Sequence, residues 1–251
     1  MNALKVLGGR GLREALRTPD ALLPTLLIPL FFLVVNVGQA ARIFPTDTTP
    51  FLKGQSYAAF QLPATILLAA SFGTAALYLV EEIENGYFDK IRATPVSRTS
   101  IALGRLISEP IKIAAMTVVI ILVALPFGVS VQSGIVGVLL LVLLAAGWAT
   151  GYAAFLQFVA LKTRSAAATN SAGLVFFPLL FLTPNFVPRD LLTDPMEVAA
   201  TLNPVTYVME AMRSLILEPL NWAAIAPGFI VVAAFVGVML VINVHVMRTY
   251  D

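Results

Sequence analysis

The sequence predicts an all-α integral membrane protein with six transmembrane helices, and three observations support this fold class. Of the 251 residues, 59% are hydrophobic and only 12% are charged, whereas soluble domains carry about a quarter charged residues. The mean hydropathy of +0.88 is typical of a chain whose solvent is lipid. The apolar residues run continuously and do not alternate in segments of about ten residues, which favours helices over a membrane barrel.

The first 20 residues form a basic N-terminal segment. Its leucines recur at roughly helical spacing between four cations, at Leu4, Leu7, Leu12 and Leu16 and at Lys5, Arg10, Arg13 and Arg17. This pattern predicts an interfacial helix whose cations meet anionic headgroups. A plain basic leader that orients the first span is the alternative. The apolar run that follows is longer than that of a signal peptide, so we expect a retained first helix.

Residues 21–251 form the predicted transmembrane domain. A helix needs about 20 apolar residues to cross a hydrocarbon core of about 30 Å. Six stretches meet this length or come close to it: Ala21–Val37, Tyr57–Val80, Ile111–Leu125, Ile135–Leu161, Ala166–Leu182 and Trp222–Met247. Prolines lie in or beside several of them, and membrane helices tolerate such kinks when neighbours bond the freed carbonyls.

The lysines and arginines predict the orientation. With six spans both termini lie on one side, and that side receives twelve of the 16 cations: Lys5, Arg10, Arg13, Arg17, Lys90, Arg92, Arg98, Arg105, Lys112, Lys162, Arg164 and Arg248. The other side receives Arg42, Lys53, Arg189 and Arg213. Because cytoplasmic loops carry the excess of cations, both termini are expected in the cytosol.

The connection between the second and third spans, residues 81–110, contains a short amphipathic pattern. Asn85-Gly86 is a turn signal, and Thr94-Pro95 biases the chain out of helix. Between them Tyr87, Phe88 and Ile91 share one helical face, with Asp89, Lys90 and Arg92 opposite. Such a helix suits docking into a groove on a cytosolic partner. A helix resting on lipid and a solvated loop are the alternatives.

The connection between the fifth and sixth spans, residues 184–221, is half apolar although it is rich in proline. Two short helices broken at Asn203-Pro204 fit this pattern better than an open loop. The pair could re-enter the outer leaflet, with Glu210 and Arg213 paired at a spacing of three residues. A helical lid on the headgroups is the alternative.

Polar residues inside the spans are few, and no span carries a central Lys, Arg, Asp or Glu, which argues against an ion-coupled carrier. We expect most of the polar residues to bond across helices: Asn36, Gln61, Gln157, Asn170, Asn243 and His245. The chain has 0 cysteines and 1 histidine, which excludes thiolate and multi-histidine metal sites. It also lacks the phosphate-loop motif, so it does not bind ATP by that route.

Taken together, these features resemble the ABC-2 type transport permeases, especially the daunorubicin-resistance type. The resemblance covers essentially the whole chain. One sharp motif, Glu-x-x-x-Gly-x-x-x-x-Ile-x-x-Thr-Pro-Val-Ser-Arg, spans residues 82–98. The other, Leu-Asn-Pro-Val-Thr-Tyr, spans residues 202–207. The chain departs from the family at Tyr87, where threonine is common, and at Ile83, where a basic residue is usual.

The resemblance implies a half-transporter that exports a hydrophobic or amphiphilic compound. Two permeases, either two copies or a copy and a paralogue, form the membrane part, and separate ABC ATPase subunits bind ATP and Mg²⁺ below it. This chain then binds no cofactor, contacts membrane lipids but no nucleic acid, and lies in the plasma membrane of a prokaryote. It is not itself an enzyme.

The resemblance also assigns residues to roles. The ATPase-coupling set is Glu82, Glu84, Gly86, Tyr87, Phe88, Ile91, Arg92, Thr94 and Pro95. The outer re-entrant set is Pro188, Asn203, Pro204, Tyr207, Glu210 and Arg213. Candidates for the translocation route are Asn36, Gln61, Asn170, Phe176 and Phe177.

Other functions compete with drug export. Permeases that export a lipid-linked glycan share this architecture, and one sequence does not separate the two substrate classes. A lipid-modifying membrane enzyme would need a catalytic cluster, and no motif supports one. A scaffold that only anchors a partner leaves the amphipathic helix and the outer segment together unexplained.

Overall fold

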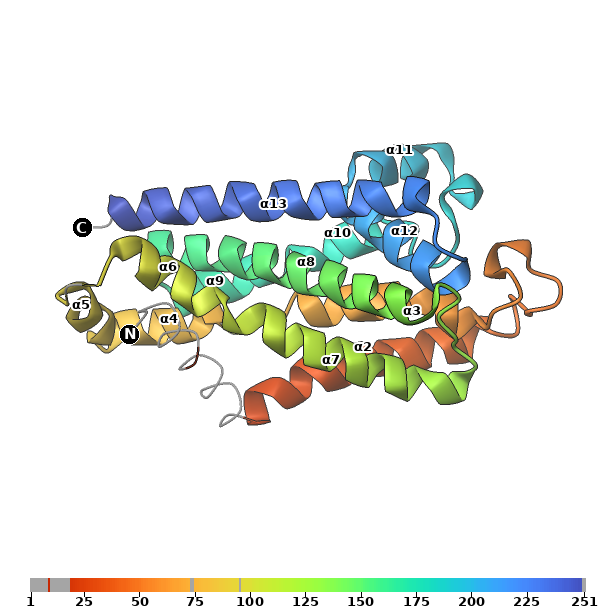
Figure 1. Ribbon diagram of the computed structural model, residues 1–251, viewed down its shortest axis with the longest axis horizontal. Coiled ribbons are helices and arrows are strands. Elements are labelled where there is room, and N and C mark those ends of the chain that lie inside the picture. The colour runs from red at the N-terminus through yellow and green to blue at the C-terminus, as the bar shows by residue number, and fades with distance from the viewer. Residues whose placement is uncertain (1–8, 10–18, 73–74, 95, 250–251) are drawn as a thin grey trace.

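The protein is an elongated bundle of helices that lie along its longest axis (Figure 1). The computed structural model describes residue 9 and residues 19–72, 75–94 and 96–249, and every regular element in this part of the chain is helical. The predicted N-terminal interfacial helix lies outside the described residues, and so does Pro95. The all-α membrane fold predicted from composition and apolar runs is confirmed.

The helices that build the bundle and its two ends are α2 (Pro19–Ala40), α3 (Tyr57–Ala70), α4 (Ala75–Glu84), α5 (Tyr87–Arg92), α6 (Arg98–Leu106), α7 (Ser108–Ala124), α8 (Gly134–Thr163), α9 (Ala166–Gly173), α10 (Phe176–Phe181), α11 (Asp194–Leu202), α12 (Pro204–Leu217) and α13 (Trp222–Arg248). The connections between them contain short 3₁₀ turns, at η1 (Pro50–Leu52), η2 (Leu125–Phe127) and η3 (Arg189–Leu191).

Four segments of the described chain are long and apolar enough to cross a membrane. They are Leu23–Ala40, Arg98–Phe127, Gly134–Thr163 and Trp222–Arg248. The other two predicted spans are divided. The second consists of α3 and α4, and the fifth consists of α9 and α10. At the end of α3, the Ser71 hydroxyl donates to the Leu67 carbonyl at 2.8 Å and accepts a hydrogen bond from the Trp148 indole N–H at 2.9 Å. Polar groups at the break between α3 and α4 are thus hydrogen-bonded within the protein.

The third span begins earlier than its sequence indicates. The apolar run predicts a helix from Ile111, but α7 starts at Ser108, and α6 precedes it where a loop is predicted. Pro110 suggests a later start. It falls instead in the first turn of α7, where a backbone N–H has no helical acceptor to lose. The Ser97 side chain caps α6 by accepting from the Ser100 N–H at 3.1 Å.

Close approach of α8 and α13 depends on small residues. A Cβ atom on Gly147 would lie 2.5 Å from Val232 Cγ1, and one on Gly151 would lie 2.6 Å from Phe235 Cδ1. These two glycines are four residues apart and therefore share a helical face, as in other tightly packed membrane helices. Further along this contact Gln157 Nε2 donates to Asn243 Oδ1 at 3.0 Å. The prediction that these two amides bond across helices is confirmed.

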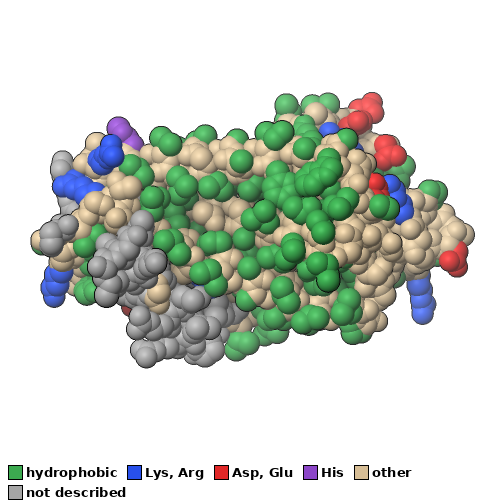
Figure 2. Space-filling view, viewed as in Figure 1, with side chains coloured by type: hydrophobic (Ala, Val, Ile, Leu, Met, Phe, Trp, Pro, Cys, Tyr) green, Lys and Arg blue, Asp and Glu red, His purple; other side chains and the backbone are tan. Residues whose placement is uncertain are grey.

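On the face drawn in Figure 2, the visible charged side chains of the described residues lie at the two ends of the bundle. Hydrophobic side chains lie over the length between them on this face. One end carries α5, the start of α6 and the end of α13, and we call it the α5 end (Figure 1). The other carries α11, α12 and the loop after α2, and we call it the α11 end (Figure 1).

Candidate functional site

The turn into α5 is built as its sequence predicts. Gly86 has a φ of 71°, in the left-handed region that favours glycine, and it directly precedes α5. The Tyr87 N–H donates to the Asn85 side-chain oxygen at 3.0 Å. After the helix, the Thr94 hydroxyl donates to the Ile91 carbonyl at 2.6 Å. The short helix predicted between the Asn85-Gly86 and Thr94-Pro95 signals is therefore confirmed as α5.

The apolar face of α5 is not free for a partner, contrary to our expectation. Phe88 is 1% exposed and Ile91 is half-buried, because both pack against the core of the same chain. Tyr87 is 41% exposed, and Asp89 and Lys90 are exposed too. The physical reason is that α5 is too short to persist alone. It packs against α4, and Phe88 is buried in the core of the same chain.

Two charged contacts fix the α5 end to the spans. Glu82 of α4 forms an ion pair with Arg105 of α6, and both side chains are largely buried. Glu82 therefore lies inside the chain, whereas Glu84 is exposed. Arg98 at the start of α6 donates to the Arg248 carbonyl at 2.8 Å, and so bonds the last turn of α13. The side chain of Arg92 lies outside the described part of the chain.

At the α11 end the predicted break at Asn203-Pro204 is confirmed. Asn203 joins the two short helices and caps α12, because its Oδ1 accepts the Val205 N–H at 3.0 Å. Its Nδ2 donates to the Leu179 carbonyl of α10 at 2.6 Å. Pro204 occupies the first position of α12, where its missing N–H costs nothing. Pro188 stands just before η3. One side-chain amide thus ties α12 to the fifth span.

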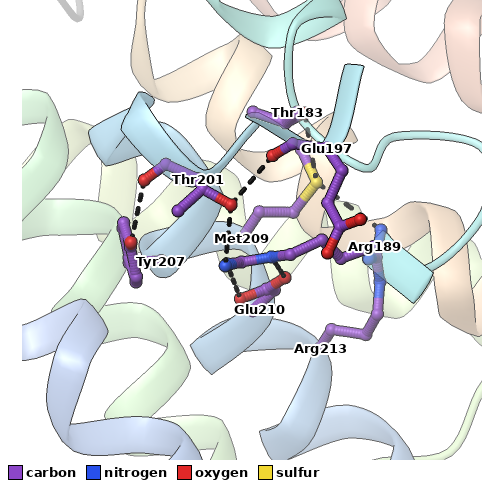
Figure 3. Close-up of polar contacts among 8 residues, drawn as sticks. All are labelled: Thr183, Arg189, Glu197, Thr201, Tyr207, Met209, Glu210 and Arg213. Atoms are coloured by element: carbon purple, nitrogen blue, oxygen red, sulfur yellow. Dashed lines mark hydrogen bonds and ion pairs between the residues drawn. The ribbon is translucent and has the colours of Figure 1, made fainter. Parts of the chain in front are cut away.

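The expected pair of Glu210 with Arg213 does not form. Glu210 instead accepts two hydrogen bonds from Arg189, at 2.7 and 3.1 Å (Figure 3). Burial alone lowers the pKa of Arg189, but the hydrogen bonds and charge of Glu210 outweigh it, so the pKa is raised. Arg189 also lies over the ring of Tyr207, 5.3 Å from its centroid. The partner from η3 was not predicted because it is 21 residues from Glu210 in sequence.

Arg213 points into the bundle. Its guanidinium lies 3.6 Å from the centroid of the Phe60 ring, and its Nε donates to the Phe60 carbonyl at 3.3 Å. In the described part of the chain no carboxylate lies within ion-pair distance of it. The π face and a carbonyl therefore stabilise this buried cation in place of an anion.

A cavity of about 420 Å³ lies among α2, the break between α3 and α4, α8 and α9. Four hydroxyl residues and one amide line it, at Thr25, Ser71, Thr169, Ser171 and Asn170, together with aromatic and aliphatic residues such as Phe72 and Phe177. This mixture of a large apolar wall and a few polar groups suits an amphiphilic ligand. Asn170 and Phe177 are the predicted route residues that the fold brings together here.

The other predicted route residues lie elsewhere. Asn36 and Phe177 line a smaller cavity of about 30 Å³, which is large enough for a water molecule. Gln61 is buried and donates to the Tyr57 hydroxyl at 2.8 Å. Phe176 is 1% exposed and packs on Trp148 and Tyr152, at ring-centroid distances of 6.1 and 5.7 Å. Gln61 and Phe176 are therefore core residues in this structure.

Sequence reasoning missed the hydroxyl residues of the larger cavity. Thr25, Ser71, Thr169 and Ser171 were not counted among the polar groups of the spans, because serine and threonine are common in membrane helices. A usable signal was present. Ser71 follows the last turn of α3 at the break in the second span, and irregular backbone at membrane depth is tolerated where it lines a cavity.

Comparison with known proteins gives two findings. The sequence model of the ABC-2 type transporter family matches residues 2–217. A relative from Streptomyces coeruleorubidus, described as "Daunorubicin resistance ABC transporter permease protein DrrB1", is 25% identical over 205 residues. That alignment covers 78% of this chain and 69% of the relative. The family match therefore includes α5, the break at Asn203 and the residues of the larger cavity.

Proposed function

Because this chain belongs to the ABC-2 type transporter family, we propose that it is the membrane permease of an ATP-driven exporter of hydrophobic or amphiphilic compounds. The observation that carries the substrate class is the cavity of about 420 Å³ with its hydroxyl, amide and aromatic lining. A drug or lipid-like molecule would bury its apolar part against Phe72 and Phe177 and bond its polar groups to Asn170 and its neighbours. The drug-resistance description of the relative favours the same class.

The energy would come from separate ABC ATPase subunits that hold ATP and Mg²⁺. This chain has no phosphate-loop motif with which to bind them. The exposed residues of α5 offer the ATPase an aromatic side chain and two charges, at Tyr87, Asp89 and Lys90. Motion of α5 would reach the spans through Glu82 with Arg105 and through Arg98 with the end of α13.

A second permease, a copy or a paralogue, would complete the membrane part. The first span supports this, because α2 exposes a row of large apolar side chains, at Leu23, Leu27, Ile28, Phe31 and Val34. The larger cavity borders the same helix, so a second permease beside α2 would close it from lipid. The cation bias of twelve to four favours termini in the cytosol, in a prokaryotic plasma membrane.

The experiment narrows the cavity and measures substrate-stimulated ATP hydrolysis. The permease is reconstituted in vesicles with its ATPase subunit and tested with a panel of amphiphilic compounds. Ser171 lines the cavity and is exposed to it, so Ser171→Phe fills part of the space. We expect this variant to lose most of the stimulation while the basal rate and the bound ATPase are unchanged.

Ala167→Phe is the matched control. Ala167 is an exposed residue of the same helix, α9, but it does not line the cavity. Equal stimulation in Ser171→Phe and in the unsubstituted protein would exclude this cavity as the substrate site. Failure of every amphiphile to stimulate hydrolysis would instead contradict the substrate class.

A further inference from the structure

A second large hollow lies on the other side of the fifth span. It is a groove of about 500 Å³ between α8, α10 and α13. Its walls are apolar, and they include Phe155 of α8, Leu179 of α10 and Ala234, Phe235 and Val238 of α13. Trp148 and Tyr152 also line it, but their polar atoms point away from it. The indole N–H donates to Ser71 at 2.9 Å, and the phenol donates to the Gly173 carbonyl at 2.8 Å. The groove therefore offers a ligand no hydrogen bond.

The packing of two membrane-crossing helices forms this groove. Gly151 allows Phe235 to approach α8 closely, since a Cβ atom there would lie 2.6 Å from Phe235 Cδ1. The fifth span is interrupted between α9, which ends at Gly173, and α10. Val175 and Leu179, at and within α10, form the wall of the groove that faces α8 and α13. Ala234 and Val238 are exposed at the opening, so the groove faces outward from α13.

We propose that one acyl chain of a phospholipid occupies this groove. Both α8 and α13 are long and apolar enough to cross a membrane, so the opening between them faces hydrocarbon. A void against Phe155 and Phe235 would forfeit dispersion contacts that a hydrocarbon chain supplies. The groove differs in this from the cavity of about 420 Å³, whose hydroxyls and amide suit a ligand with polar groups.

The end of the groove nearest α11 indicates which leaflet supplies the lipid. Pro204 lines the groove, and Tyr207 follows one turn later on the same side of α12. Arg189 lies 5.3 Å over the Tyr207 ring and is partly exposed. Tyrosine and arginine side chains combine an apolar part with a polar end, and such side chains are typical of the lipid headgroup region of a membrane. A lipid whose headgroup lies beside Arg189 would reach the groove from the leaflet at the α11 end.

An acyl chain in this groove would pack against the side of α10 that faces away from the cavity of about 420 Å³. Val175 and Leu179 face the groove, while Phe177 lines both cavities on the opposite side of the same short helix. The helix α10 therefore separates the groove from the cavity of about 420 Å³. This inference concerns lipid binding and does not depend on the transported compound.

The chain has 2 tryptophans, which permits a direct test. In a Trp222→Phe background, Trp148 is the single fluorophore and lines the groove. The protein is reconstituted in phosphatidylcholine vesicles whose acyl chains carry bromine atoms, which quench tryptophan on contact. Each variant is compared with itself in unbrominated vesicles. We expect strong quenching of Trp148, and we expect Ala234→Phe to remove most of it by filling the groove.

Ala233→Phe is the matched control, because Ala233 is an exposed neighbour on α13 that does not line the groove. It should leave the quenching unchanged. Equal quenching in the two variants would overturn the proposal, since bulk lipid around the bundle would then be its source. Absence of Trp148 quenching would also overturn the proposal. If Ala234→Cys then formed disulfide-linked dimers in this cysteine-free chain, the groove would instead be covered by a second copy of the protein.

Discussion

Glu82 and Arg105 illustrate how a single pair can matter in an apolar protein. The two side chains form an ion pair between α4 and α6, and both are largely shielded from solvent. A buried charge is tolerated when a partner of opposite sign is in place, and it becomes costly when that partner is removed. Arg213 is stabilised differently, by the ring and the carbonyl of Phe60. Local sequence does not distinguish the two situations.

Removing one member of the Glu82–Arg105 pair should destabilise the protein more than removing both. We expect Glu82→Met to lower the free energy of unfolding by about 3 kcal/mol, because it leaves Arg105 charged and buried without its partner. Arg105→Met should do the same to Glu82. The double variant should recover most of the loss, and thermal unfolding in detergent micelles measures all three. Additive losses in the double variant would contradict the importance of the pair.

The short elements are where structure and sequence differ most. The helix α5 lies between the two predicted turns, but the core of the same chain buries Phe88 and leaves Tyr87 exposed. The helix α6 was expected to be loop, although the Ser97 side chain caps it. A partner that docks at this end would therefore contact Tyr87, Asp89 and Lys90, and Phe88 supports them from inside.

Tyr87→Ala should weaken binding of the ATPase subunit without unfolding the permease. Loss of a buried aromatic anchor at an interface costs about 2 kcal/mol, which weakens association roughly thirtyfold. The affinity of the detergent-solubilised permease for its ATPase measures the effect. Phe127→Ala is the matched control, because Phe127 has the same exposed fraction of 41% but lies between α7 and α8, at the other end of α7.

Phe88→Ala should behave differently from Tyr87→Ala. Because Phe88 is buried in the same chain, its truncation should lower the stability of the permease itself, by about 3 kcal/mol or more. Thermal unfolding in detergent micelles measures this loss.

Unchanged ATPase affinity in Tyr87→Ala would exclude the exposed side of α5 as the docking surface.

At the scale of the whole molecule, the face in Figure 2 shows charged side chains of the described residues at the two ends of the bundle and hydrophobic side chains between them. The first and last described spans fit an even number of crossings, because α2 runs toward the α11 end and α13 runs back from there to the α5 end (Figure 1). Of the six predicted spans, the second and the fifth are each divided into two helices, and the other four correspond to the segments long and apolar enough to cross a membrane.

Single cysteines should report the two sides of the membrane. Ser97 lies at the α5 end and Thr48 in the loop at the α11 end, and both are exposed. A membrane-impermeant thiol reagent applied to intact cells should label Thr48→Cys only. In inverted vesicles it should label Ser97→Cys only, because the cation bias favours the α5 end in the cytosol. Labelling of both variants from one side would contradict the six-span topology.

The sequence by itself determined the all-α membrane class, the approximate places of the apolar segments and the turns at Gly86 and Asn203. These features follow from continuous apolar length and from local backbone chemistry, such as the glycine at position 86 and the cap at Asn203. Both are properties of neighbouring residues, so a single sequence displays them. The pairing of Gln157 with Asn243 was also within reach, because an amide at membrane depth requires a partner.

Tertiary structure alone decided which side chains face a cavity, a partner or the core. Phe176 and Phe177 are adjacent and chemically identical, yet the first is packed between aromatic rings and the second lines both cavities. Likewise Glu210 bonds Arg189 from another segment and not Arg213 on its own helix. In a chain that is apolar on all sides, hydrophobicity does not mark the buried face of a helix. The contacts between helices distant in sequence determine it.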